Sequence, residues 1–193
     1  MNQRCLRRWI SVWSFSVPLL LSACANTIPK PDYDKQIATQ YLIRSNDHPQ
    51  VKVETGDGVH LLAIDRERIR EIIAEKLDKR RMSNPPIGAP RSCIVNVTIT
   101  RYQRGNAFER AMLAGLGQIH INGDVLAMDA SSKQTLDEFK IAKTFAWGGI
   151  YGASTSMQDI ERTFADGVAA ALTGQAESQK PAEKELKDPA YGK

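Results

Sequence analysis

The stretch CIVNVTIT, residues 93–100, alternates between apolar and polar side chains and is the clearest structural signal in the chain. The apolar positions of one parity are Cys93, Val95, Val97 and Ile99, and the polar positions of the other are Asn96, Thr98 and Thr100. Successive side chains of a strand point to opposite faces of a sheet, so this pattern predicts a strand with one buried face.

Two later stretches repeat the alternation and predict two more strands. The first, residues 119–127, places Ile119, Ile121, Val125 and Ala127 on the inner face, and Gly123 marks a bulge or a close approach. The second places Phe139, Ile141, Phe145 and Trp147 on the same kind of face. The turn residues 132–134 between them predict antiparallel neighbours.

Two amphipathic helices complete the pattern. In the first, Asp65 is a candidate cap, and Ile69, Ile72, Ile73 and Leu77 recur at three- and four-residue steps. In the second, Ser156 and Asp159 have the spacing of a capping box, and Gly174 is a suitable terminator. The apolar stripe of the second helix is Ile160, Phe164, Val168, Ala171 and Leu172.

The predicted order is strand, helix, three strands, helix, with the first strand near residues 51–54. Each element has a single apolar face. We therefore predict an α+β domain over residues 50–174, a two-layer sandwich in which two amphipathic helices pack on one face of a small antiparallel sheet.

The first 23 residues predict a lipoprotein signal peptide. Arg4, Arg7 and Arg8 precede an apolar run over residues 9–21, which is shorter than the roughly 20 residues that a membrane span needs. The following LSAC, residues 21–24, resembles a bacterial lipobox, in which Cys24 becomes lipidated and N-terminal. An ordinary cleaved signal with a chance cysteine is the alternative.

The predicted lipid fixes where the protein acts. By resemblance to enterobacterial lipoproteins, Ala25 after the cysteine directs the chain to the outer membrane, anchored by lipid and facing the periplasm. Residues 24–49 fit an extended tether, in which the apolar Tyr41, Leu42 and Ile43 dock on the domain or on a partner. The charged segment 175–193 is predicted to be a disordered tail.

Charge and cysteine content narrow the classes of function. The chain has 26 basic and 22 acidic side chains, and loss of the three leader arginines leaves 23 against 22, a charge near +1. This balance argues against a nucleic-acid binder. Cys5 leaves with the leader and Cys24 carries lipid, so Cys93 has no partner for an internal disulfide and is predicted to be a buried small hydrophobe.

Catalytic and metal-binding motifs are sparse, and we expect no enzyme activity, cofactor or metal. The histidines are His48, His60 and His120, and none has zinc-site spacing. His120 and Asp124 share one strand face, which leaves a weak acid/base or metal site as a minor alternative.

Two segments are candidate partner-binding sites. Trp147, Ile150 and Tyr151 lie in a glycine-rich loop, and they either close the core, which is the more ordinary role, or anchor a partner. Phe108 and Met112, with Leu113, either cover a sheet edge or dock on another protein or subunit. Arg101, Arg104 and Arg110 flank the second segment and are expected to be a solvated cluster.

Four short motifs carry a resemblance to a known family: RGN at 104–106, RAMLAGLG at 110–117, GDV at 123–125 and WGGIYG at 147–152. With them the chain resembles uncharacterised bacterial envelope lipoproteins that share the domain of unknown function 4410, over about residues 51–172. The resemblance implies no catalytic residues.

The sequence favours a membrane-anchored, non-catalytic binding or accessory component of envelope assembly or secretion. Its partner would be an envelope protein or a second copy of the chain. The alternatives are a homo-oligomeric structural lipoprotein and, less favoured, a small-ligand-binding protein or enzyme.

Overall fold

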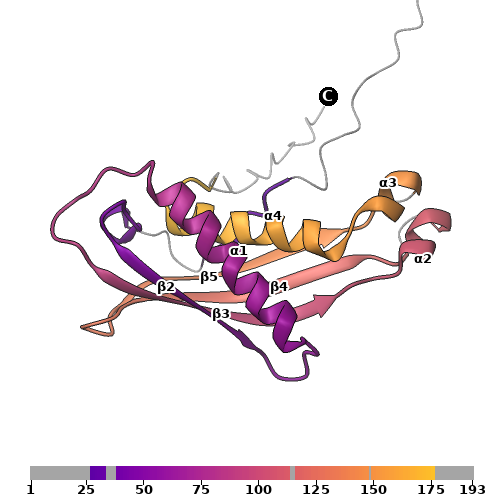
Figure 1. The fold of residues 1–193 in the computed structure, drawn as a ribbon, viewed down its shortest axis with the longest axis horizontal. Helices are drawn as coiled ribbons and strands as arrows, with labels where there is room; N and C mark the ends of the chain where they lie inside the picture. Colours follow the sequence, from indigo (N-terminus) through magenta and orange to yellow (C-terminus); the bar gives the residue numbers. More distant parts are fainter. Residues whose placement is uncertain (1–26, 34–37, 114–115, 148, 177–193) are drawn as a thin grey trace, which may run out of the picture.

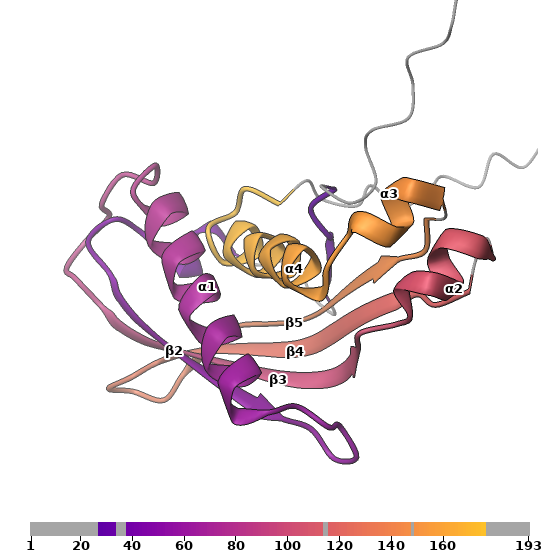
Figure 2. The same ribbon diagram turned by 45° about the vertical axis from the view of Figure 1, so that its right-hand side comes forward.

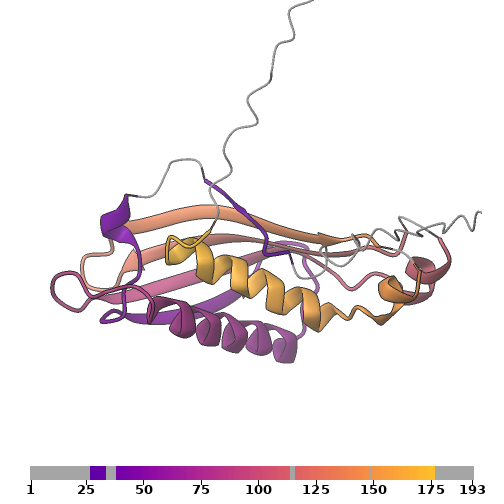
Figure 3. The ribbon, with the colours of Figure 1, turned by 90° about the horizontal axis from the view of Figure 1, so that it is seen from above.

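The computed structural model describes residues 27–33, 38–113, 116–147 and 149–176. One five-stranded sheet carries two long helices, α1 (Ala63–Arg81) and α4 (Met157–Leu172), on one of its faces (Figures 1 and 3). No helix of the described residues covers the opposite face of the sheet. This arrangement confirms the predicted α+β architecture with two helices on one face.

The sheet is mixed, with the strand order β1-β5-β4-β3-β2. The strands β3 (Ser92–Gln103), β4 (Ile119–Asp129) and β5 (Thr135–Phe145) are antiparallel neighbours, as predicted. The strand β2 (His48–Thr55) instead runs parallel to β3, with Val53 opposite Val97. The prediction of a wholly antiparallel sheet is wrong for this pair, because α1 carries the chain back to the end of the sheet where β2 began.

The predicted apolar faces meet between the sheet and the helices. Cys93, Val95, Val97 and Ile99 are fully buried, as are Ile119 and Ile121 on the next strand. Gly123 marks a close approach, because a Cβ atom there would lie 3.0 Å from Cζ of Phe164 on α4. Burial raises the pKa of the Cys93 thiol to about 11, so this cysteine stays protonated and behaves as a core residue.

The start of α1 differs from its prediction. The helix begins after Leu62, and Asp65 lies within its first turn with its carboxylate buried. Asp65 accepts hydrogen bonds from Arg68 at 2.6 Å and from Arg104 at 2.5 Å. Burial opposes the charge of Asp65, but these two guanidinium groups hold its pKa below the ordinary value.

The same ionic network joins α1 to α4. Glu161 of α4 is fully buried and accepts two hydrogen bonds from Arg68, each at 2.8 Å, and one from the Tyr102 hydroxyl at 2.6 Å. A buried carboxylate is tolerated only when it is paired in this way. The helix α4 begins and ends as predicted, with the Ser156–Asp159 capping box at its start and Gly174, at a positive φ of 71°, after its end.

Much of the predicted tether lies on the domain. The strand β1 (Pro31–Asp32) pairs with β5, and the short 3-10 helix η1 (Thr39–Tyr41) leads to Ile43, which is only 1% exposed. Asp47 is buried and binds Arg91 at 2.6 Å. The folded domain therefore begins before the predicted boundary at residue 50, because Ile43 supplies apolar surface and Asp47 supplies an ion pair. The leader, Cys24 and residues 177–193 lie outside the described residues.

Candidate functional site

Two short helices form the end of the domain that carries the predicted binding residues. The helix α2 (Ala107–Met112) follows β3, and α3 (Gly149–Ser154) follows β5. Although about 40 residues separate them in sequence, they pack against each other just beyond the end of the sheet (Figure 2). The N-cap of α2 is Asn106, whose Oδ1 accepts hydrogen bonds from the N–H groups of Phe108 and Glu109.

Arg110 joins the two helices from within. It is 3% exposed, and its guanidinium donates to the carbonyl oxygens of Gly117 at 2.8 Å, Gly152 at 2.9 Å and Thr155 at 3.1 Å. The expected solvated arginine cluster is therefore wrong for Arg110. Arg104 and Arg101 are exposed, and they bind Asp65 and Gln103 respectively.

Glycine is required at two of the contacts around Arg110. Gly117 has a φ of +65°, and a Cβ atom there would lie 2.3 Å from the Asn106 carbonyl oxygen. A Cβ atom at Gly152 would lie 2.1 Å from the Trp147 carbonyl oxygen. The two glycine-rich motifs of the sequence thus form one packed unit, with Arg110 at its centre.

The outer surface of this unit is apolar. Ile150 is 92% exposed, Phe108 72%, Met112 69% and Trp147 37%. Leu113 and Leu116 are exposed beside them. We name these six side chains the α2–α3 apolar cluster: Phe108, Met112, Leu113, Leu116, Trp147 and Ile150.

The exposure decides between the two roles considered for these residues. The core-closing role is wrong for Ile150, because nearly all of its side chain is in contact with solvent, and most of the Phe108 side chain is exposed as well. The side chain of Tyr151 lies outside the described part of the chain. An exposed apolar patch of this kind is typical of a surface that binds a partner.

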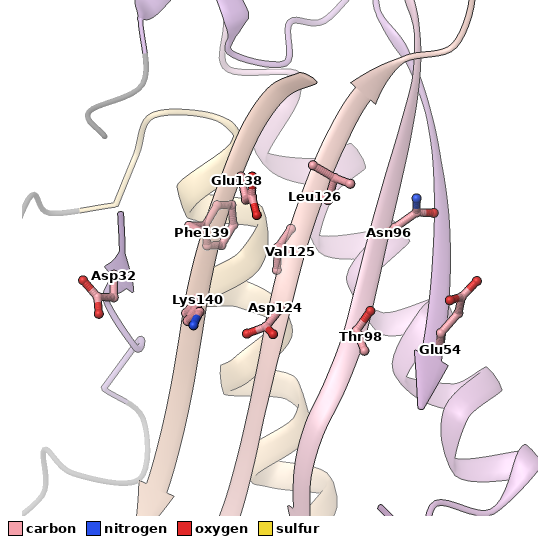
Figure 4. Close-up of a pocket in the computed structure, with 10 residues that line it drawn as sticks. All are labelled: Asp32, Glu54, Asn96, Thr98, Asp124, Val125, Leu126, Glu138, Phe139 and Lys140. Atoms are coloured by element: carbon pink, nitrogen blue, oxygen red, sulfur yellow. The ribbon is translucent and has the colours of Figure 1, made fainter. Parts of the chain in front are cut away.

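The open face of the sheet holds the other candidate residues. One row of paired residues crosses the strands in register: Glu54, Thr98, Asp124, Lys140 and Asp32. These side chains line a hollow of about 310 Å³, and Figure 4 shows them spread over several strands. All five are charged or polar, so the hollow has a polar lining along this row.

The structure does not bring His120 and Asp124 together at a site. Four residues along one strand correspond to about 13 Å, and His120 is not among the residues that line the hollow. The Nδ1 atom of His120 lies 3.0 Å from the Thr144 hydroxyl on β5. Within the described ranges, no group of three or more His, Cys, Asp or Glu residues is arranged to hold a metal ion.

None of the helices in the described ranges is both long and apolar enough to cross a bilayer.

Several solved structures are similar to this chain. A variant of PelC from Paraburkholderia phytofirmans, solved as a dodecamer, has 10% sequence identity and a TM-score of 0.48, covering 75% of this chain and 95% of its own. A candidate lipoprotein from Caulobacter crescentus CB15 has 14% identity and a TM-score of 0.38, covering 66% and 87%. The protein XCC0632 from Xanthomonas campestris has 10% identity and a TM-score of 0.42, covering 77% and 97%.

Comparison of sequences gives the family. No curated protein is similar enough in sequence to count as a relative. The family described as Domain of unknown function (DUF4410) matches residues 39–149, a range that includes β2, α1, β3, α2, β4 and β5 as well as the contacts that Arg110 makes with Gly117. Because this match spans more than half of the chain, the protein belongs to the DUF4410 family.

Proposed function

We propose that this chain is a lipid-anchored protein of the bacterial outer membrane that faces the periplasm and acts as a non-catalytic binding component in envelope assembly or secretion. The α2–α3 apolar cluster carries the proposal. Six large apolar side chains exposed on and beside two short helices lower the solubility of a domain unless something covers them. A covering partner explains why the chain keeps them there.

The hydrogen bonds that hold the backbone of the cluster support a binding role. Arg110 joins α2 to α3 through buried hydrogen bonds to the carbonyl oxygens of Gly152 and Thr155, and Asn106 caps α2. A surface held in one conformation loses little conformational entropy when it binds. The cluster is therefore preorganised for a partner.

The lipid anchor is tested by mass spectrometry and by cell fractionation. We expect the mature protein to begin at Cys24 with acyl chains on its sulfur, and Cys24→Ser to leave the membrane fraction. Cys93→Ala is the matched control, since Cys93 is buried in the core and its loss leaves the anchor in place. An intact leader, or an unmodified thiol at Cys24, would contradict the proposal.

The binding surface is tested by crosslinking in intact cells. A photoreactive amino acid at Ile150 is expected to crosslink to an envelope component, either a protein or a lipid. The same amino acid at Ile87, which is also exposed but lies in the loop after α1, is the control and is expected to stay unreacted. Equal crosslinking at the two positions would show that the cluster is not a binding surface.

Self-association is the second candidate, and one feature of the sheet favours it. The strand β2 is the last in the sheet order, so its outer edge has no strand partner among the described residues. Such an edge can pair with another chain. Sedimentation of the domain without its lipid tests this, because a monomer at all concentrations excludes edge pairing.

A further inference from the structure

The position of the N-terminal segment relates the α2–α3 apolar cluster to the membrane. Pro31 pairs with Ile141 and Asp32 with Lys140 in antiparallel register. The chain therefore runs from Asp32 back to Thr27 in the direction of Phe145, the end of β5 that leads to α3. In Figure 3 this segment lies beside α4 and runs in the direction of the α2–α3 end.

Two contacts hold this segment in place. The Lys143 ammonium donates a hydrogen bond to the Thr27 carbonyl oxygen. Farther along, Pro29 lies against α4 at Gly167, where a Cβ atom would come within 2.6 Å of the proline ring. The segment therefore has a defined path on the domain as far back as Thr27.

The lipid attachment point is close to this path. Cys24 precedes Thr27 by three residues, which span at most about 11 Å when extended. Lys143, which binds Thr27, precedes Trp147 by only four residues. The attachment point of the lipid is therefore within about 11 Å of Thr27, which Lys143 binds on the half of β5 that leads to the cluster.

We propose that the α2–α3 apolar cluster inserts into the surface of the lipid leaflet that holds the Cys24 acyl chains. This inference rests on the proposed lipid anchor and names the bilayer as the partner of the same surface. The anchor keeps the cluster beside the leaflet, so insertion is an intramolecular step at high effective concentration.

The side chains suit this environment. Helices that bind at a bilayer surface bury Phe, Leu and Trp in the boundary between headgroups and acyl chains. The cluster presents Phe108, Trp147 and four aliphatic or thioether side chains in one place. Trp147 is 37% exposed, and tryptophan is enriched at the level where acyl chains meet headgroups.

Insertion would fix the orientation of the domain. The α2 and α3 helices project beyond the ends of the strands, so the sheet would stand on this end (Figure 1). The loop with Ile87 follows the other end of α1 and would then point away from the membrane (Figure 1). The open face of the sheet, with Asp124 and Lys140, would then stand roughly perpendicular to the membrane and be exposed to the periplasm.

Trp147 supplies a direct test. Trp9 and Trp13 leave with the signal peptide, so Trp147 is the sole tryptophan of the mature protein. The lipidated protein is placed in vesicles of phosphatidylethanolamine and phosphatidylglycerol, with and without acyl chains brominated near the headgroup. We expect brominated lipid to reduce the Trp147 emission, because bromine quenches an indole that lies close to it.

Matched variants separate insertion from simple tethering. Ile150→Asp is expected to reduce the quenching, whereas Ile87→Asp, which places the same charge on a distant exposed isoleucine, leaves it unchanged. Vesicle-bound protein whose Trp147 emission is insensitive to brominated lipid would overturn insertion while leaving the anchor intact.

The remaining outcomes are equally decisive. An emission shift that appears without vesicles as protein concentration rises, with no quenching by brominated lipid, would assign the cluster to a second copy of the chain and overturn insertion. An unmodified Cys24 would overturn both the anchor and the insertion that depends on it.

Discussion

At the scale of single residues, Arg110 is the main difference between expectation and structure. The sequence places it among other arginines near a predicted strand end, a pattern that is typical of solvated charge. Its acceptors at Gly152 and Thr155 are 42 and 45 residues away. Local periodicity carries no information on such distant backbone contacts. The only sequence signal for these contacts is the pair of glycines at 117 and 152, because each marks a place where two backbone segments approach closely.

Asp137 gives a prediction on pH. It lies on the inner face of β5, 8% exposed, and its Oδ2 has no hydrogen-bond partner among the described residues. Burial raises its pKa to about 7. The folded state thus holds a proton that the unfolded state releases near pH 4, and stability falls as pH rises between these values.

The expected slope for this one group is up to about 1.4 kcal/mol in unfolding free energy per pH unit between pH 5 and 7. Asp137→Asn removes this slope and raises the stability above pH 7, measured by urea unfolding at several pH values. Asp124→Asn, on the open face of the sheet, is the control and keeps the slope. An unchanged pH profile in Asp137→Asn would contradict the assignment.

Gly117 gives a prediction with a built-in control. Gly117→Ala combines a positive φ with a contact of 2.3 Å to the Asn106 carbonyl oxygen, and we expect it to cost about 3 kcal/mol of unfolding free energy. Gly88→Ala has a similar φ of +71° but open space around it, and is expected to cost only about 1 kcal/mol. Equal losses in the two variants would mean that the contact with Asn106 does not matter.

At the scale of elements, the patterns with a regular period are the ones that the sequence predicts well. The strands β3, β4 and β5 each bury one face, and their apolar positions identify that face. The predicted apolar stripe of α4 is buried too, although six consecutive residues of its C-terminal half are also buried. The direction of β2 is not encoded in this way, since a two-residue alternation is the same in both directions. The short helices α2 and α3 also escape prediction, because six residues are too few to show a helical period.

The stability of α2 is predicted to depend on its cap. Six residues form a marginal helix, and Asn106 accepts two of its free N–H groups. Asn106→Ala is expected to increase amide hydrogen exchange in residues 107–112, with a loss of about 1 kcal/mol, while the strands keep their protection. Asn106→Asp retains the acceptor and is expected to behave like the unaltered protein. If amide protection in α2 is the same in Asn106→Ala as in the unaltered protein, the cap does not stabilise this helix.

At the scale of the whole molecule, the boundary of the domain is the least predictable feature. Residues 27–47 are rich in proline and charge, which is typical of a tether, and only the apolar residues at 41–43 hinted at docking. Burial of Ile43 and the pairing of β1 arise from contacts with α4 and β5, far along the chain.

A comparison of two truncated proteins tests this boundary. A chain of residues 27–176 is expected to be more stable than a chain of residues 50–176 by at least about 2 kcal/mol, because the shorter one loses the burial of Ile43 and the Asp47–Arg91 pair. Urea unfolding measures the difference. Extension of the longer chain to residue 193 is the control and is expected to change the stability little. Equal stabilities would mean that the N-terminal segment adds nothing to the fold.

The two-residue strand β1 has a mechanical consequence. It shares only two residue pairs with β5, so tension on the N-terminus would detach it well before the body of the sheet yields. The next firm hold is at residues 40–43, where Arg91 binds the carbonyl oxygens of Gln40 and Leu42 and Ile43 is buried. The released residues 27–39 would span at most about 45 Å when fully extended. This length sets the upper limit on how far the domain could move from its anchoring point with its sheet and both long helices still folded.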